Sequence, residues 1–162
     1  MNAIYFVEDI SFDYILPLID KIQNSKGEKF VLYLSTNGGS ATASLFFRNW
    51  LRHTNKIKKI ICIGDINSGG ALLLCGLKPI KRLAYPYITF GIHSLRFTND
   101  EYPIPFNEQL TYNKTSSFLE DTIIDIYYKY LNIDDNILEK IKAGYTYYIN
   151  PIDAKRIGLI DD

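Results

Sequence analysis

The chain has 162 residues, 47% of them hydrophobic, and its 18 basic residues balance 18 acidic ones. This length suits one domain with a sizeable core, and the neutral balance gives no electrostatic case for binding nucleic acid or an anionic membrane. No apolar run approaches a membrane span, and residues 1–7 lack the basic start and the length of a signal peptide. We therefore expect a soluble protein that is not exported.

Cys62 and Cys75 lie in apolar runs, and their spacing does not resemble that of metal ligands. Buried free thiols are therefore expected, in preference to a disulfide or a ligand pair. Free thiols fit a reducing compartment, so we expect a cytoplasmic protein. No metal site and no cofactor is predicted.

The first fifty residues read as strand, helix, strand, helix. Residues 3–8 form the first strand, and Ser11 is the expected N-cap of a helix that ends in the turn at residues 24–28. The second strand ends at Ser35, and a helix opens at Ser40. The residues expected to face the core are Phe12, Ile15, Leu16, Ile19 and Ile22 in the first helix and Leu45, Phe46, Trp50 and Leu51 in the second.

The segment 64–71 is central to the chain. Before it, residues 59–63 are β-branched and read as a buried strand, and after it residues 71–75 continue as a buried helix that Gly76 closes. Ser68 thus stands on a strand-to-helix turn, with its hydroxyl at the positive end of the helix dipole. Gly69 and Gly70 leave room for a substrate carbonyl beside backbone N–H groups, which is suitable geometry for a nucleophile. The alternative is that Ser68 only caps the helix, and this segment by itself favours capping.

Two further strand ends supply polar groups to the same region. The strand that ends at Ser35 is followed by glycines, which offer a second cluster of backbone donors. Residues 87–93 form a third apolar strand with His93 at its end. Because ligands and catalytic groups gather at one edge of a parallel sheet, Ser68 and His93 are expected to lie close together.

The rest of the chain is more helical. Residues 107–131 form a long helix whose apolar stripe comprises Phe118, Leu119, Thr122, Ile123, Ile126, Tyr127 and Tyr130. This stripe could cover the helix's own core or pack against another subunit. A helix over 133–143, a short strand over 145–149 and a helix capped by Asn150 and closed by Gly158 complete the chain. The alternation of strands and helices predicts one α/β domain with a mainly parallel sheet.

The motifs resemble those of the Clp protease proteolytic subunit. A glycine pair after a strand, Gly-x-x-x-Ser-x-Gly-Ala at 64–71 and Ile-His at 92–93 occur in that family's order and rough spacing. Residues 148–161 also resemble the family's closing segment, which ends in Gly-Leu-x-Asp. The match spans nearly the whole chain.

The resemblance implies the Clp/crotonase-like fold, a spiral of ββα units, as a single domain over 1–162 with a handle region at about 96–131. It implies a serine peptidase without cofactor or metal, acting on peptides or unfolded chains, in which Ser68 is the nucleophile and His93 the general base. The backbone N–H groups of Gly39 and Gly69 are the expected oxyanion donors. Assembly into a homo-oligomeric ring through the handle is also implied.

Two departures from the family pattern affect this expectation. The family's catalytic aspartate aligns with Thr146, whose hydroxyl can accept an imidazole N–H but carries no charge to stabilise the imidazolium. A weak, conditional or absent activity is therefore an open alternative, and a carboxylate near residue 120 or on a neighbouring subunit could substitute. The family's N-terminal axial loop and C-terminal extension have no counterpart, so docking to an ATP-driven unfoldase is doubtful.

Three functions remain open from the sequence. The first is a ring-forming serine peptidase, and the second is a catalytically impaired subunit that serves as a scaffold or partner. The third is a crotonase-type acyl-CoA enzyme, which would not need Ser68 and His93 together. The sequence contains no feature that would contact the adenine of such a cofactor.

Overall fold

The computed structural model describes residues 1–96 and 106–162, except for the side chains of residues 106–112. Within this part of the chain, strands and helices mostly alternate. The strands are β1 (Asn2–Phe6), β2 (Phe30–Thr36), β3 (Ile57–Asn67), β4 (Lys81–Ala84), β5 (Phe90–Ile92) and β6 (Tyr147–Ile149). The helices are α1 (Phe12–Asn24), α2 (Ala41–His53), α3 (Gly69–Leu74), α4 (Phe106–Tyr130), α5 (Asp135–Lys142) and α6 (Pro151–Arg156).

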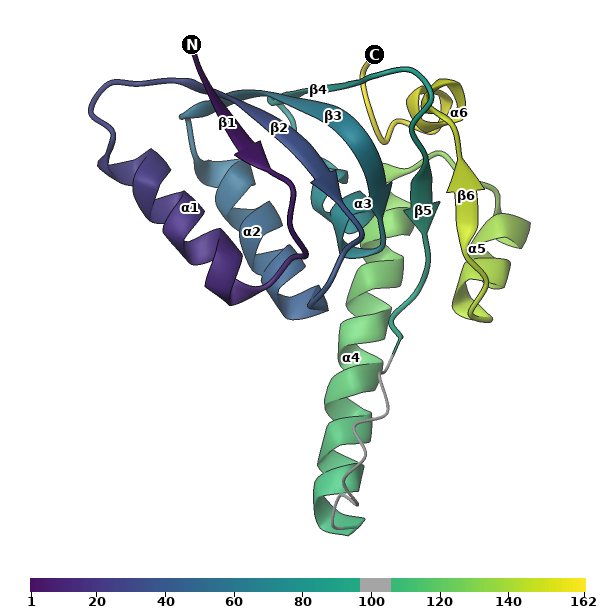
Figure 1. Cartoon of the computed structure of the whole chain (residues 1–162). Helices are drawn as coiled ribbons and strands as arrows, with labels where there is room; N and C mark the ends of the chain where they lie inside the picture. The colour runs from purple at the N-terminus through teal and green to yellow at the C-terminus, as the bar shows by residue number, and fades with distance from the viewer. Residues whose placement is uncertain (97–105) are drawn as a thin grey trace.

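The strands form one sheet in the order β1-β2-β3-β5-β6, and β4 also pairs with β3. All pairs are parallel except β5 with β6, which is antiparallel. Helices α1 and α2 cover one face of β1 to β3 (Figure 1). The sequence prediction of an α/β fold with a mainly parallel sheet is therefore confirmed.

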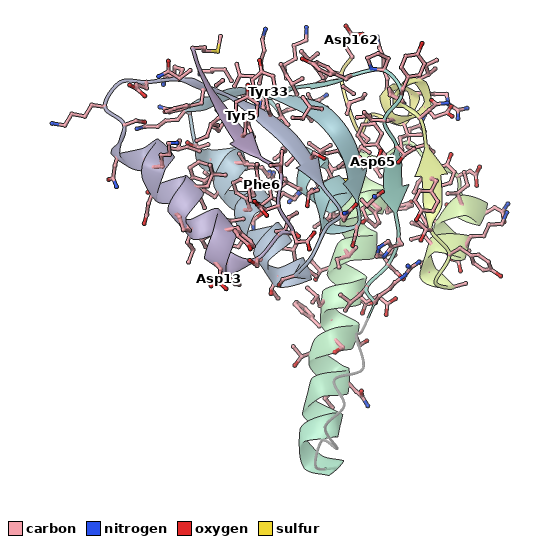
Figure 2. The ribbon with its side chains drawn as sticks, in the orientation of Figure 1. Tyr5, Phe6, Asp13, Tyr33, Asp65 and Asp162 are labelled. Carbon is pink, nitrogen blue, oxygen red and sulfur yellow. The ribbon has the colours of Figure 1, made fainter. Side chains whose placement is uncertain are left out.

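The main core lies between this sheet and its helices. Strand β2 contributes one of its faces to this core. Its residues Phe30, Leu32 and Leu34 are buried at alternate positions, while the residues between them are only half-buried. On the other face, Tyr33 stacks on Tyr5 of β1 with ring centroids 4.9 Å apart (Figure 2). The sheet thus has an apolar face under the helices and an aromatic pair on the opposite face.

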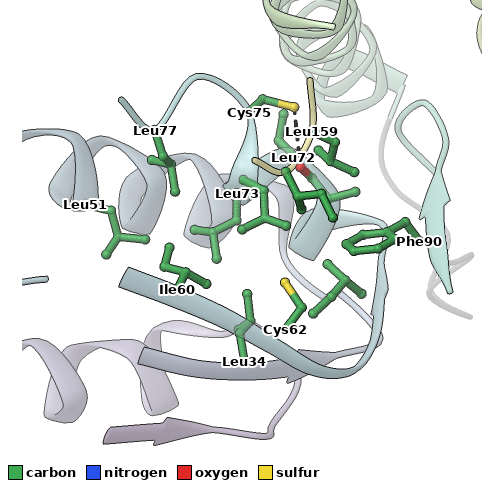
Figure 3. Packing of buried hydrophobic residues seen from close by; sticks show 14 of the residues in the cluster. Leu34, Leu51, Ile60, Cys62, Leu72, Leu73, Cys75, Leu77, Phe90 and Leu159 are labelled. Atoms are coloured by element: carbon green, nitrogen blue, oxygen red, sulfur yellow. Dashed lines mark hydrogen bonds between the residues drawn. The ribbon is translucent and has the colours of Figure 1, made fainter. Parts of the chain in front are cut away.

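Helix α3 is the most deeply buried helix of the described chain. All six of its residues are buried, and it packs among β2, β3 and β5 (Figure 3). Cys62 and Cys75 lie in this cluster as free thiols, and burial raises the pKa of each to about 12. The prediction of buried free cysteines is confirmed.

The buried face of α2 differs from the sequence prediction. Phe46 is 43% exposed and packs edge-on against Phe12, whereas Phe47 is fully buried. The true inward face also carries Ser44 and Arg48, whose polar groups bond to backbone carbonyls. The face predicted from the apolar residues is therefore rotated by about one residue from the observed buried face. The reason is that two of the buried positions carry polar residues, which the apolar pattern does not include.

Helix α1 begins after Ser11 as predicted, but the Ser11 side chain makes no capping hydrogen bond. Phe12 and Leu16 are exposed, contrary to prediction, so only the isoleucines of the expected stripe are buried. The later caps behave as expected from their residue types. Asn150 accepts from the N–H of Asp153 at 2.9 Å and thereby starts α6.

Helix α4 matches the long helix predicted over 107–131, although residues 97–105 of the expected handle region lie outside the described residues. Its C-terminal half is anchored, since Ile123 and Tyr127 are buried and the Tyr127 hydroxyl donates to the His93 carbonyl at 3.2 Å. Its N-terminal half extends away from the sheet (Figure 1), and Phe118 is 75% exposed. The helix therefore covers its own core at one end, and of the predicted stripe Phe118 is left exposed.

We expect Phe47→Ala to lower the free energy of unfolding by about 3–5 kcal/mol, because it opens a cavity under α2. Phe46→Ala is the matched control, and it should cost about 1 kcal/mol, the loss of one exposed aromatic pair. Urea unfolding at fixed protein concentration measures both. Equal losses in the two variants would contradict the observed face of α2.

Candidate active site

Ser68 occupies a strained turn between β3 and α3. Strand β3 continues past Gly64, where the sequence prediction ended it, and reaches Asn67. Ser68 then adopts φ 56° and ψ −121°, a conformation that residues other than glycine rarely adopt. A serine on such a strand-to-helix turn has the geometry of a nucleophile elbow.

The Ser68 side chain makes no capping hydrogen bond to α3. Its backbone is held instead, because its N–H donates to the Gly91 carbonyl of β5 at 2.7 Å. Capping was the alternative role for Ser68, and the structure offers no contact in its favour. The acceptor residue, Gly91, lies two positions before His93, so this bond holds the Ser68 turn close to the segment that carries His93.

Gly38 fits closely against this turn. A Cβ atom added to Gly38 would lie 2.5 Å from Ser68 Cβ and 3.0 Å from its Oγ, and the residue has φ 106°. Any side chain here would collide with Ser68 and strain the backbone. The glycine pair after β2 is therefore required by its approach to the serine.

Gly39 and Gly69 present backbone donors beside Ser68. The bonds Ile10 N–H to Gly38 O (2.6 Å) and Ser40 N–H to Ile10 O (2.8 Å) hold both neighbours of Gly39. They leave the Gly39 N–H without an acceptor among the described residues. Gly69 is the first residue of α3, where helix N–H groups lack intrahelical partners.

A cavity of about 340 Å³ brings these groups together. Ser68, His93, Gly39 and Gly69 all line it, whereas Thr146 does not. Burial, with a smaller contribution from the charge of Arg96, lowers the pKa of the half-buried His93, while a hydrogen bond to Ser94 opposes that shift. Neutral imidazole, the form that can act as a base, is therefore favoured.

The His93 ring is held by a backbone group. Its Nδ1 lies 2.6 Å from the carbonyl oxygen of Ser94. Because a carbonyl can only accept, Nδ1 carries the proton and Nε2 of the neutral ring is left free to accept one. Among the described contacts, His93 makes no side-chain hydrogen bond to Ser68 or Thr146.

Thr146 and His93 each lie one residue beyond the paired part of β5 and β6. The last pair of that ladder is Ile92 with Tyr147. The Thr146 hydroxyl oxygen accepts from Arg96 Nη2 at 2.5 Å, and the same nitrogen donates to Gly144 O at 3.2 Å. Arg96 thus bonds to the expected third residue, and its charge also contributes to the lowered pKa of His93.

The sequence reasoning missed Arg96 and the Ser94 carbonyl. A backbone acceptor has no signature in sequence, and the only signal for Arg96 is its place three residues after His93. The carboxylates near residue 120, which are Glu120, Asp121 and Asp125 on α4, make no hydrogen bond to His93 in the described structure, and a carboxylate from a neighbouring subunit stays a prediction. No carboxylate of the described chain therefore contacts the imidazole.

No three His, Cys, Asp or Glu side chains of the described residues gather as a metal site requires. Across the same residues, no helix is both long and apolar enough to cross a bilayer.

We expect the His93 pKa to lie below its ordinary value of 6.5, because burial and Arg96 both disfavour the imidazolium. Titration by NMR in a His53→Gln background isolates this ring, since the chain has only 2 histidines. Arg96→Gln should raise the pKa by removing the smaller of the two lowering effects. A pKa at or above 6.5 in the parent would contradict the described surroundings of the ring.

Comparison with known proteins places the chain in a family. The Clp protease family model matches residues 14–162. The ATP-dependent Clp protease proteolytic subunit of Borrelia garinii is 29% identical over 160 residues, covering 96% of this chain and 78% of that protein. The protein of the same name from Deinococcus radiodurans is 28% identical over 151 residues, covering 90% and 69%. The chain therefore belongs to the Clp protease family.

Proposed function

We propose that this protein is a serine peptidase in which Ser68 is the nucleophile and His93 the general base. The observation that carries the proposal is the strained Ser68 turn, whose side chain does not cap α3 and which lines one cavity with His93. Family membership supports the same chemistry. Peptides and unfolded chains are the proposed substrates.

The proposed reaction is acyl transfer. His93 Nε2 accepts the Ser68 hydroxyl proton as Oγ attacks the peptide carbonyl, and the Gly39 and Gly69 N–H groups stabilise the oxyanion. The imidazolium then gives its proton to the leaving amine, and the C–N bond breaks. Water, deprotonated by His93, hydrolyses the acyl-enzyme and restores Ser68. Losing one oxyanion donor typically costs about 10²–10³ in kcat.

We propose Thr146 as the third residue of this arrangement. His93 and Thr146 both lie one residue beyond the last β5–β6 pair, Ile92 with Tyr147, which supports their proximity. The Thr146 oxygen that accepts from Arg96 has a second lone pair, and in this proposal it takes the imidazole Nδ1–H in place of the Ser94 carbonyl. In a serine protease, replacing the catalytic aspartate by asparagine lowers kcat about 10⁴-fold. Since neither Thr146 nor the Ser94 carbonyl carries a charge, we expect slow turnover.

A catalytically impaired subunit is the second candidate function. The observation in its favour is Arg96, whose positive charge lowers the His93 pKa and would oppose the imidazolium formed during attack. Such a subunit could keep the fold and the assembly while contributing little hydrolysis. The acyl-CoA alternative has no comparable observation in its favour.

We also propose that α4 mediates assembly into a ring. Phe118 and Tyr128 on this helix are 75% and 68% exposed, which is more aromatic surface than a helix in water requires. A second copy of the chain that packed against α4 would remove these two aromatic side chains from water. Light scattering that gives a monomer mass at micromolar concentration would remove this proposal.

Ser68 should react covalently with a fluorophosphonate, because an activated serine oxygen attacks phosphorus and displaces fluoride to give a phosphonate ester. Intact-mass analysis is expected to show one adduct per chain, lost in Ser68→Ala and retained in Ser117→Ala, a control serine on the exposed face of α4. A slow reaction would still fit the uncharged third residue. An adduct that survives Ser68→Ala would contradict the assignment.

Thr146→Asp should raise kcat/KM for small ester or peptide substrates, because a carboxylate would orient the imidazole and stabilise its charged form. The gain has an upper limit of about 10⁴-fold, reduced by the pairing of the new carboxylate with Arg96. Thr146→Asn is the matched uncharged control and should give little gain. An unchanged rate in Thr146→Asp with assembly intact would favour the impaired-subunit function.

A further inference from the structure

A second cavity, of about 710 Å³, lies apart from the candidate active site and shares no lining residue with it. Its walls come from the ends of α2 and α4, the turn after α3, strand β4 and the C-terminal segment. We call it the basic pocket. Its lining residues are Arg52, Gly76, Lys78, Arg82, Lys129, Tyr130, Lys155, Gly158, Ile160 and Asp161.

Several cations of the basic pocket form no direct ion pair. Arg82 pairs with Asp161 at 2.8 Å, and Lys155 pairs outside the lining with Asp162 at 2.7 Å. The remaining three, Arg52, Lys78 and Lys129, make no direct ion pair within the described residues, although the charge of Lys78 helps Arg82 to lower the pKa of Asp161. Because the whole chain has a net charge of zero, this excess of positive charge is local to the pocket.

Tyr130 forms a wall of the pocket at which cations converge. Its ring centroid lies 5.7 Å from Arg52 Cζ and 5.5 Å from Lys129 Nζ. On the same ring, Arg48 Cζ lies at 5.1 Å. Three positive charges around one aromatic ring repel one another, so the arrangement favours a bound anion.

Arg48 is the buried member of this group. The residue is only 2% exposed, its Nε donates to the Cys75 carbonyl at 2.8 Å, and its Nη2 is buried without a hydrogen-bond partner in the described structure. A buried guanidinium with no carboxylate costs free energy that a nearby negative charge would offset. Arg48 therefore adds positive potential behind Tyr130.

Ordinary helix-end electrostatics explains only part of this cluster. Arg52 and Lys129 lie in the last turns of α2 and α4, where cations stabilise the helix dipole. Lys78 lies in the turn after α3 and belongs to no helix, and Arg48 stands in the middle of α2. The Tyr130 ring attracts Arg48 and the helix-end cations, and Asp161 attracts Lys78, but these contacts leave the positive charge of the pocket in excess over its one lining carboxylate.

We propose that the basic pocket binds a small anion with one or two phosphate groups. Guanidinium forks and mobile ammonium groups from three elements match the several acceptor oxygens and the charge of a phosphate or diphosphate. The volume lies in the range of pockets that hold small molecules and cofactors. The proposal is independent of the Ser68 chemistry, since the two cavities are separate.

Isothermal titration with pyrophosphate at low ionic strength tests the proposal, with inorganic phosphate, sulfate and citrate as comparison anions. We expect one site per chain, an affinity that falls as salt rises, and weaker binding of sulfate and citrate than of pyrophosphate. The triple variant Arg52→Gln, Lys78→Gln, Lys129→Gln should lose at least about tenfold in affinity. Lys140→Gln, which removes one exposed charge from α5, is the control and should bind as the parent does.

The controls separate loss of binding from loss of structure. The triple variant should keep its urea midpoint and its reaction with a fluorophosphonate; if it does not fold, the single variant Lys78→Gln should still bind several-fold more weakly. Absence of pyrophosphate binding, or equal binding by the parent and the Lys78→Gln variant, would overturn the proposal. If citrate or an acidic peptide bound more tightly than pyrophosphate, the pocket would be a carboxylate site, and the proposal of a phosphate site would be overturned.

Discussion

The hydrogen bond from the Ser68 N–H to the Gly91 carbonyl is the contact on which the site depends. It joins the end of β3 to β5 at the point where the chain turns into α3, and the serine there has a positive φ. Such a conformation persists only where the surroundings determine it. Here Gly38 packs on one side of the turn and the fully buried α3 follows on the other.

The strand order also brings the other proposed site residues near Ser68. Parallel strands end at the same edge of the sheet, so the segment after β2 brings Gly39 there, and β5 brings His93. Antiparallel β6 begins just after Thr146, one residue beyond the pair of Ile92 with Tyr147. The gathering of the proposed Ser68, His93 and Gly39 groups therefore follows from the strand order.

Electrostatics separates this site from an aspartate-containing triad. A neutral carbonyl holds the His93 ring, and the charge of Arg96 contributes to its lowered pKa. The carbonyl can orient the ring, but it supplies no negative charge to stabilise an imidazolium. Arg96 also bonds to the Thr146 hydroxyl, so the electrostatics of the proposed site depend on a residue that lies outside the recognisable motifs.

Sequence reasoning located the features that short patterns determine. The Ser68 turn, the buried thiols and the Asn150 cap each depend on a few neighbouring residues, and the structure has them. The inward face of α2 could not be predicted, because Arg48 is buried through a bond to the distant Cys75 carbonyl. The contact of His93 with the Ser94 carbonyl is local, but a backbone acceptor has no signature in sequence. The Arg96 contacts with Gly144 and Thr146 join segments about fifty residues apart, and no local pattern encodes them.

A crystal structure of the fluorophosphonate-treated protein would test the central claim most directly. We expect phosphorus bonded to Ser68 Oγ, with the phosphoryl oxygen about 2.7–3.1 Å from the N–H groups of Gly39 and Gly69 and with His93 Nε2 facing the modified serine. An adduct on another residue, or a phosphoryl oxygen turned away from both glycines, would contradict the account.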